Sequence, residues 1–331
     1  MMRAVLIFNP TSGISTITDK RMSPEETESA ILAGLRAFGI EPQVLHTTLE
    51  DGGQEMARRA ALDGAELVIA AGGDGTIHAA ANGLVGTQSI LGIIPTGTMN
   101  NVARSLSIPD TIPAACVAIA NGETRAIDMG KINDRTFLEV AGVGLEAKLA
   151  PAGEAIKHPE LFSIIHGIVS GLKAFFDFKA ANIKIAADGG KHRSYHALQV
   201  TICNTPFYGL HLQMAPDILM DDGLLDVVIY RNVGKFEYLR HALSLLLGRR
   251  PERPKIKYLR VRSLHVTTDA RMEVHIDGEP GGYTPAHVTV LPAALRIRVP
   301  GKDAPGLQED TNAVKRKDVP PGATSIAAQS S

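Results

Sequence analysis

The chain has 331 residues, a formal net charge of -1, 44% hydrophobic residues and 21% charged residues, so no global charge directs it toward nucleic acid or acidic partners. Aromatic residues make up only 5% and tryptophan is absent, which argues against a base-stacking surface for nucleic acid. Only Cys116 and Cys203 are present, too few for a disulfide framework or a metal-thiolate site.

The first hundred residues alternate short apolar runs with helical patterns. The apolar runs predict strands at 4–8, 44–46, 67–71 and 91–95. The first helix should begin at Ser23, because Pro24 suits the first helical position and Glu26 completes a capping box; Gly39 marks its end. Such alternation predicts a parallel sheet covered by helices, with a ligand site at the carboxyl ends of the strands.

The second half is rich in strand-like runs, so the length and the change of pattern predict two domains, residues 1–127 and 128–300. The runs lie at 137–143, 183–187, 198–203, 225–230, 272–276 and 295–299. Two helical stretches, 161–178 and 236–247, interrupt them. Residues 301–331 are rich in Pro, Gly, Ser and charge, which predicts a disordered tail.

Neither end of the chain nor its longest apolar stretch predicts insertion into a membrane. The N-terminal apolar run is too short for the core of a signal peptide, so we expect a cytoplasmic chain. The stretch 161–178 contains His166, Lys173 and Asp177, which interrupt it as a spanning helix. Any membrane contact should therefore be peripheral, at the inner face of the membrane.

The strongest local signal is the turn AAGGDGT, which follows the predicted strand at 67–71 and precedes a helix. Its glycines let backbone amides approach a phosphate, Asp74 is placed to interact with a nucleotide-bound metal, and Thr76 can donate a hydroxyl. The turn matches neither the Walker A loop nor G-x-G-x-x-G. The alternative is a tight turn in which Asp74 only caps the helix.

A second turn of this type, PTGTMNN, follows the next predicted strand and includes Gly97 and Thr98. A third, NPTSG, ends the first strand and begins with Asn9. Carboxyl ends of parallel strands meet at one edge of a sheet, so the turns should form one site for a phosphate chain.

Six segments together resemble the catalytic domain of diacylglycerol kinases, sphingosine kinases and their soluble bacterial relatives: NPTSG, AGGDGTIHAAANGL, GIIPTGTMNNVARSLSIP, IDMGKIN, MDDGLLDVVIY and VHIDGEP. They follow the order of that family along nearly the whole chain to Pro300, and LPAALRIRVP is similar to bacterial kinases of diacylglycerol or phosphatidylglycerol. The resemblance implies an α/β nucleotide-binding domain with a phosphofructokinase-like, mostly parallel sheet, followed by a β-rich sandwich domain whose last strand packs back on the first.

The same resemblance implies that ATP and Mg²⁺ are cofactors. It places the nucleotide on Asn9, Thr48, Gly72, Gly73, Asp74, Gly75, Thr76, Ile77, His78, Gly97 and Thr98. It gives catalytic roles to Asp277 and Glu279, together with Asp74, because a carboxylate can accept the proton of a lipid hydroxyl. From the residues alone, an ordinary hairpin turn is the favoured interpretation of Asp277-Gly278-Glu279.

A structural Mg²⁺ site is implied at the DDGL segment, with the Asp222 carboxylate and the carbonyls of Leu219 and Leu224 as ligands. The alternative there is an Asx turn. The chain also departs from the family pattern at two positions, since Asn101 stands where many relatives have Asp and His78 where Asn is frequent.

We expect a lipid kinase that transfers the γ-phosphoryl group of ATP to a membrane lipid hydroxyl. Diacylglycerol, phosphatidylglycerol and a sphingoid base all remain open as acceptors. Basic residues between 240 and 262 are expected to contact the membrane, although they can also form a solvated face. The alternatives are a nicotinamide-nucleotide (NAD) kinase, which also uses a GGDGT turn, and a catalytically silent nucleotide-binding regulator. Nothing in the sequence indicates an oligomeric state.

Overall fold

The computed structural model describes residues 2–12, 22–48, 50–149, 161–209, 212–213, 217–246 and 255–301. Within the chain, Met1–Gly301 forms one compact unit. All but the first residue of the tail predicted at 301–331 lies outside the described residues.

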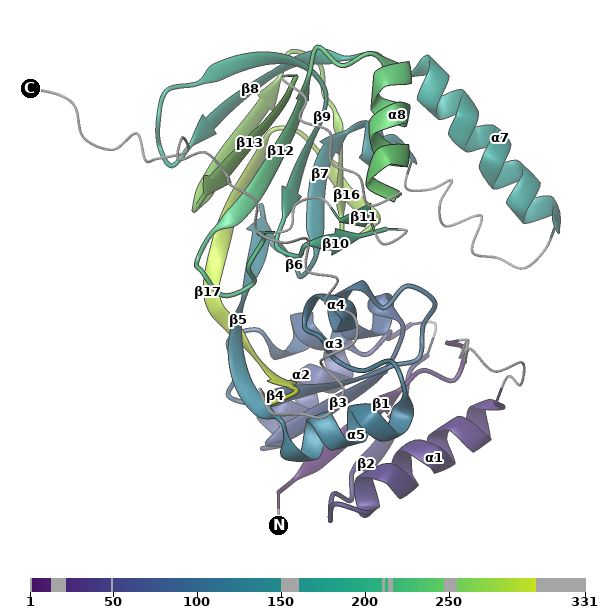
Figure 1. The fold of residues 1–331 in the computed structure, drawn as a ribbon. Helices are drawn as coiled ribbons and strands as arrows, with labels where there is room; N and C mark the ends of the chain where they lie inside the picture. Colours follow the sequence, from purple (N-terminus) through teal and green to yellow (C-terminus); the bar gives the residue numbers. More distant parts are fainter. Residues whose placement is uncertain are drawn as a thin grey trace, which may run out of the picture. The chain divides into compact units, whose positions relative to one another are not determined.

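The N-terminal half contains four parallel strands in the order β4-β3-β1-β2, as the alternating pattern predicted (Figure 1). The strands are β1 (Ala4–Phe8), β2 (Gln43–His46), β3 (Leu67–Gly72) and β4 (Ile90–Pro95). The helices are α1 (Pro24–Arg36), α2 (Gln54–Leu62), α3 (Asp74–Leu84), α4 (Asn101–Ser105) and α5 (Ile112–Asn121). The predicted capping box of Ser23 and Glu26 is present at the start of α1.

Helices cover both faces of these strands because the strand side chains alternate between two cores. Val5 and Ile7 of β1 belong to a cluster that includes residues of α2 and α3, whereas Leu6 and Phe8 pack with residues of α1 and α5. A strand buried on both faces is typical of a parallel α/β sheet. The turns predicted to bind phosphate directly follow the carboxyl ends of β1, β3 and β4.

The C-terminal half is antiparallel, and its strands join the same sheet in the order β16-β15-β7-β9-β8-β14-β17. These strands are β7 (Val140–Gly144), β8 (Ala181–Ala187), β9 (Arg193–Cys203), β14 (Ser263–Thr268), β15 (Glu273–Ile276), β16 (Glu279–Tyr283) and β17 (Ala286–Val299). Outside that path lie β5 (Glu123–Ile132), β6 (Arg135–Phe137), β12 (Leu225–Arg231) and β13 (Ile256–Val261). A separate pair is formed by β10 (Phe207–Tyr208) and β11 (Leu212–Gln213).

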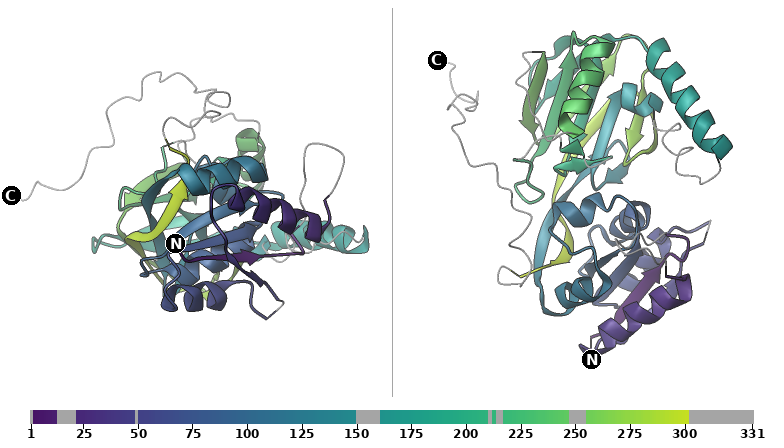
Figure 2. Two further views of the ribbon diagram at one scale, coloured as in Figure 1. Left: turned by 90° about the horizontal axis from the view of Figure 1, so that it is seen from below. Right: turned by 45° about the vertical axis from the view of Figure 1, so that its right-hand side comes forward.

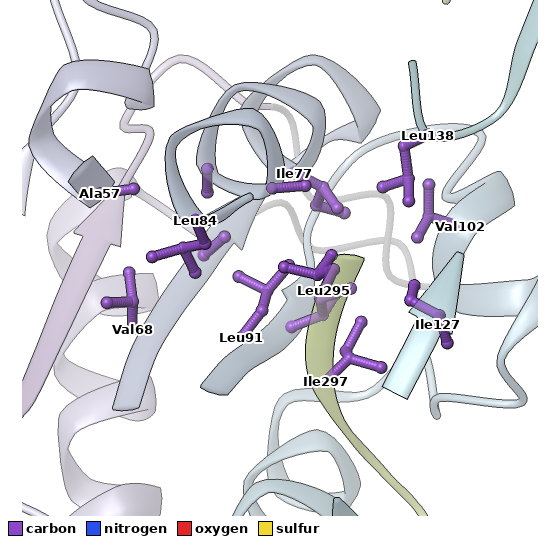
Figure 3. Close-up of a cluster of buried hydrophobic side chains, with 14 of the residues drawn as sticks. Ala57, Val68, Ile77, Leu84, Leu91, Val102, Ile127, Leu138, Leu295 and Ile297 are labelled. Carbon is purple, nitrogen blue, oxygen red and sulfur yellow. The ribbon is translucent and has the colours of Figure 1, made fainter. Parts of the chain in front are cut away.

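Two strands connect the halves. β17 pairs with β14 near its start and in parallel with β4 near its end, where Arg296 lies opposite Ile90. Figure 3 shows Leu295 and Ile297 of β17 in the same buried cluster as Leu91 of β4. β5 is antiparallel to β17 over most of its length, so the boundary predicted at 127 falls inside a paired strand. The division at that residue stays a prediction.

Several strand predictions differ in extent from the structure; the run at 198–203, for example, is the second half of β9. The run at 137–143 is split into β6 and β7, because the amides of Leu138, Glu139 and Val140 all donate to the carboxylate of Asp277 instead of continuing one ladder. The run at 295–299 is only the end of β17, which has 14 residues and carries an irregularity between Leu291 and Leu295.

The predicted helical stretches appear as α7 (Leu161–Asp177) and α8 (Lys235–Leu246). Figure 2 shows them beside each other at one side of the antiparallel strands. No helix among the described residues is both long and apolar enough to cross a membrane.

Candidate active site

The three polar turns meet at the carboxyl ends of β1, β3 and β4. Ser12 Oγ lies 2.6 Å from Thr96 Oγ1, and Asn9 Nδ2 donates to Thr76 Oγ1 at 3.0 Å. The amide of Thr96 donates to the carbonyl of Gly72 at 3.0 Å. The three turns were predicted to converge, and in the structure they contact one another.

Glycine is required where the turns AAGGDGT and PTGTMNN touch. A Cβ atom added to Gly97 would lie 2.5 Å from the Cα atom of Gly73, and one added to Gly72 would lie 2.5 Å from Thr76 Oγ1. Helix α3 begins at Asp74 directly after this contact, and no side chain caps its N-terminus. Its first amides are therefore oriented for an anion, which suits a phosphate group.

The predicted nucleotide residues differ in their accessibility. Gly75 and Thr98 are exposed at this edge, whereas Ile77 is fully buried in the core (Figure 3). Thr48 follows β2 and turns its hydroxyl toward its own loop, accepting from the amides of Glu50 and Asp51. Gly75 and Thr98 can present their groups to a ligand, whereas Ile77 contributes through its backbone and its packing.

Asp74 lies between the turns and the start of α4. Its Oδ1 atom accepts from the amide of Val102 over 3.4 Å, a long hydrogen bond. Beside it, Asn101 donates through Nδ2 to the carbonyl of Gly209 at 3.1 Å and, more weakly, to Glu139 at 3.5 Å. The Asn101 Oδ1 atom is buried and has no hydrogen-bond partner among the described residues. This amide oxygen suits a cation or a donor supplied by a ligand.

A buried charged cluster joins the two halves of the chain at this point. His78 of α3 places Nε2 at 2.9 Å from Glu139 Oε1 and Nδ1 at 3.9 Å from Asp277 Oδ2. Burial disfavours the imidazolium, but the charges of Asp277 and Glu139 outweigh it and raise the pKa of His78 to about 10. Burial raises the pKa of Glu139 to about 7 against the opposing effect of His78. His78 is thus held as a cation at neutral pH.

Asp277 and Glu279 have different environments. The buried carboxylate of Asp277 accepts from the amides of Leu138, Glu139 and Val140 at 2.8 to 2.9 Å. The Glu279 side chain is 73% exposed and forms an ion pair with Arg135 at 2.9 Å. The Asp277 carboxylate therefore holds the backbone of residues 138–140 in place, and the Glu279 carboxylate faces solvent.

The loop 204–209 is held against the nucleotide half. The guanidinium of Arg104 lies 5.6 Å from the ring centroid of Phe207, and the carbonyl of Gly209 accepts from Asn101. Asn204 Nδ2 donates to two backbone carbonyls, those of Asp128 and Leu138. These contacts place the loop next to α4 and the charged cluster.

A second buried polar chain, which the sequence did not indicate, continues from this loop into the antiparallel half. Tyr208 stacks on His275, whose Nε2 lies 3.3 Å from Glu146 Oε2. Glu146 also accepts from Thr201 at 3.2 Å. The VHIDGEP segment contains His275 but gave it no role, and Tyr208, Glu146 and Thr201 lie on other elements, so no local pattern links these residues. Glu139 was missed for the same reason, although the unusual residues at His78 and Asn101 were a signal that their neighbourhood had changed.

The DDGL segment has the geometry of a closed turn. Asp222 accepts from the amide of Leu224 through Oδ1, as in an Asx turn, and pairs with Arg260 through Oδ2. Leu219 is half exposed. Among the described residues, no group of three or more His, Cys, Asp or Glu side chains is arranged to hold a metal ion. Both carboxylate oxygens of Asp222 thus have a partner within the protein, and the Mg²⁺ site with Asp222, Leu219 and Leu224 stays a prediction.

Comparisons with known proteins agree with this arrangement. The sequence profile of the diacylglycerol kinase catalytic domain matches residues 3–132, and that of the YegS C-terminal NAD kinase beta sandwich-like domain matches residues 140–299. Diacylglycerol kinase of Bacillus subtilis is 30% identical over 313 residues, covering 93% of this chain and 100% of the relative. Diacylglycerol kinase of Staphylococcus epidermidis is 29% identical, covering 90% and 92%.

The fold has a match among solved structures as well. The crystal structure of a diacylglycerol kinase from Bacillus anthracis superimposes with a TM-score of 0.71 at 23% identity, covering 90% of this chain and 97% of the other. That likeness confirms the predicted α/β domain followed by a β-sandwich-like domain. The match to the Bacillus subtilis relative, together with the matching catalytic-domain profile, shows that the chain belongs to the diacylglycerol kinase family of lipid kinases.

Proposed function

We propose that this protein transfers the γ-phosphoryl group of ATP to a hydroxyl group of a diacylglycerol-type lipid, in a reaction that requires Mg²⁺. The observation that carries the proposal is the contact between the glycine turns at Gly73 and Gly97, which sets the open N-terminus of α3 beside the acidic cluster of Glu139 and Asp277. Groups of the N-terminal half that are suited to bind phosphate thereby lie next to carboxylates of the C-terminal half.

The nucleotide side of the site follows from these contacts. The first amides of α3 and the exposed turn at Gly75 and Thr98 are oriented to bind phosphate oxygens. Asp74 and the unpartnered Oδ1 of Asn101 offer the hard oxygen atoms that Mg²⁺ prefers. When bound, Mg²⁺ neutralises charge on the transferred phosphoryl group. The positive charge of His78 lies behind this surface and balances the carboxylates that face it.

Acceptance of the proton from the lipid hydroxyl is assigned here to Glu279. Both carboxylate oxygens of Asp277 already accept hydrogen bonds from backbone amides. Glu279 follows it in the same hairpin and is exposed. Its ion pair with Arg135 lies at the surface, so breaking that pair costs little free energy. Asp277 would then be a positioning residue that fixes the hairpin and the start of β7.

The acceptor is proposed to be diacylglycerol because the relatives that match over nearly their whole length carry that activity in their names. The loop 204–209 supports an acceptor site next to the phosphate turns, since Asn101 and Arg104 of α4 hold it there.

The test is a transfer assay with γ-labelled ATP and Mg²⁺. The acceptors are diacylglycerol, phosphatidylglycerol, sphingosine and NAD, and mass spectrometry identifies the product. We expect label in phosphatidic acid and none in NADP. Label in the dinucleotide would support the nicotinamide-nucleotide kinase alternative, and no product with any acceptor would contradict the proposed activity.

A further inference from the structure

Three histidines of the antiparallel half lie together at its surface, and none of them belongs to the polar turns or the charged cluster. His265 of β14 is directly opposite His287 of β17 in the strand ladder, and the two rings stack with their centroids 4.0 Å apart. The ring centroid of His192, in the connection between β8 and β9, lies 5.5 Å from that of His265. His192 and His287 are exposed and His265 is half-buried. We call these three side chains the histidine cluster, and the proposed reaction leaves them without a role.

Two ring nitrogens of the cluster lie at an unusual separation. His192 Nε2 is 3.4 Å from His265 Nδ1, which is longer than an ordinary hydrogen bond. Two imidazole nitrogens bound to one tetrahedral ion, each at about 2.0 to 2.1 Å, are about 3.3 to 3.4 Å apart. The observed separation therefore matches two ligands of a shared ion better than it matches a direct hydrogen bond.

The connection that carries His192 is fixed beside β14. Asp188, in the same connection, accepts through Oδ1 from the amides of Arg262 and Ser263 at 2.8 Å each. The amide of Asp188 donates to the carbonyl of Ser263 at 3.0 Å. Ser263 begins β14, and His265 follows it by two residues. Three hydrogen bonds that do not involve imidazole therefore hold the two histidines near each other.

His287 is placed to supply a third nitrogen. Its amide donates to Asn133 Oδ1 at 3.0 Å, and its carbonyl accepts from the amide of Asn133 at 2.8 Å, so its backbone is fixed. Opposite residues of an antiparallel pair have Cβ atoms about 4.5 to 5.5 Å apart, which lets two imidazoles reach one ion. The ring of His287 is stacked on that of His265, so it must turn about its side-chain bonds to do so. Among the described residues, accordingly, no three ligating side chains are already arranged around one point.

We propose that the histidine cluster binds one late first-row divalent metal ion, such as Zn²⁺, Ni²⁺ or Cu²⁺, through His192 Nε2, His265 Nδ1 and a ring nitrogen of His287. Imidazole nitrogen suits these ions, whereas Mg²⁺ prefers oxygen ligands and retains water. The site is therefore separate from the Mg²⁺ of the proposed reaction, and the inference does not depend on that reaction. On the neighbouring strand β8, the ammonium group of Lys184 is paired with Asp269 at 3.1 Å, which offsets its repulsion of a bound cation.

Zinc binding by the full chain, prepared without a polyhistidine tag, tests the site. Calorimetry at about pH 7.5, where imidazole is mostly neutral, should find Zn²⁺ binding that an excess of Mg²⁺ does not displace. His192→Gln, His265→Gln and His287→Gln should each weaken it about tenfold or more, since even an outer-shell partner of a metal ligand contributes about 10- to 100-fold. His196→Gln is the matched control, because His196 is exposed on β9 and contacts Asn182 instead of the cluster.

Melting curves and Co²⁺ spectra give two further readings. A bound ion links the β8–β9 connection, β14 and β17, so Zn²⁺ should raise the melting temperature of the parent and of His196→Gln but not that of His265→Gln. Without metal, all variants should melt within a few degrees of the parent, since the substitutions lie at the surface. Co²⁺ should give the visible absorption of a tetrahedral nitrogen site with the parent and lose it with His265→Gln.

Several results would overturn the inference. One is a parent that binds no Zn²⁺ at submillimolar concentration, and another is an equal loss of affinity in His196→Gln. A third is full affinity in His287→Gln, which would remove the third ligand. Phosphorylation of diacylglycerol by the parent with Mg²⁺ reports the proposed function separately, because no residue of the histidine cluster belongs to the proposed active site.

Discussion

Asp277 and Glu279 are two residues apart in one hairpin, yet their surroundings suit different tasks. Asp277 is buried and accepts three backbone amides, whereas Glu279 is exposed and paired with Arg135. A carboxylate that satisfies several buried amides stabilises the local fold, because each lost acceptor costs about 1 to 3 kcal/mol. The exposed carboxylate contributes little to stability and is available for proton transfer.

Conservative amide substitutions should therefore distinguish the roles of Asp277 and Glu279. Glu279→Gln should keep the parent melting temperature and ATP affinity but lose about 10² to 10⁴ in turnover, the usual effect of removing a general base. Asp277→Asn should lower the melting temperature as well as turnover, because its amide nitrogen cannot accept a hydrogen bond. Calorimetric melting, ATP titration and lipid phosphorylation measure the three quantities. Unchanged turnover in both variants would assign the proton acceptor to another group.

His78 and Glu139 form a buried pair at the contact between the two halves of the chain. Because the pKa of His78 is raised from 6.5 to about 10, its contribution to the free energy of unfolding is complete below pH 6.5 and disappears as the pH rises through about 10. The raised pKa of Glu139 acts in the same direction between about 4.5 and 7, where ionisation of the buried carboxyl costs stability.

The melting temperature should accordingly fall as the pH rises from about 7 to about 10, and His78→Asn should flatten this dependence. The single variant should also be less stable than His78→Asn combined with Glu139→Gln, since the single change leaves a buried carboxylate without its cation. Melting curves across the pH range test both expectations. A parent and a His78→Asn variant with the same pH dependence would show that another group titrates in this window.

At the scale of elements, the loop before β12 is held by residues of β5 and β13. The buried carboxylate of Asp128 in β5 accepts from the amide of Gly223 at 2.6 Å and from that of Ala293 at 2.8 Å. Asp222 turns the same loop back on itself and pairs with Arg260 of β13. This network can hold the loop without a cation, or it can rearrange around one if Mg²⁺ displaces the arginine.

Magnesium linkage distinguishes these possibilities. If Asp222 with the carbonyls of Leu219 and Leu224 binds Mg²⁺, the ion should raise the melting temperature of the parent but not that of Asp222→Asn. A ligand at 100 times its dissociation constant adds about 2.7 kcal/mol. Asp221→Asn is the control, because Asp221 pairs with Arg125 and is not a predicted ligand. Equal shifts in all three proteins would exclude Asp222 as a ligand.

At the scale of the whole molecule, one sheet connects the two halves of the chain. β17 pairs with β14, β4 and β5, so a single strand is hydrogen-bonded to both the antiparallel and the parallel strands. The contact of His78 with Glu139 is a second connection, at the proposed site itself. The turns and the charged cluster are therefore held together by strand pairing at a distance as well as by the contact of His78 with Glu139.

Local patterns predicted the parallel half well. Apolar runs such as Ala4–Phe8 coincide with strands because side chains on both faces of a central strand are buried, and the Ser23 capping box acts within one turn of helix. The turns at Gly72 and Gly97 were predictable because parallel strands bring their ends to one edge.

Contacts between distant segments were not predictable from such patterns. The split between β6 and β7 depends on Asp277, which follows Leu138 by 139 residues. The pairing of β17 with β4 and the buried pair of His78 and Glu139 also join segments that no local pattern connects. The sequence therefore predicted which turns meet at the edge of the sheet better than it predicted which distant side chains lie beside them.

Phosphoryl transfer by the parent and by Asp74→Ala tests the account most directly. Labelled ATP, Mg²⁺ and diacylglycerol in mixed micelles should give phosphatidic acid with the parent. Asp74→Ala should melt within a few degrees of the parent, since it removes a partly exposed side chain from the first turn of α3, but lose a factor of about 10² or more in turnover. A folded Asp74→Ala variant that phosphorylates diacylglycerol at the parent rate would contradict the proposed site.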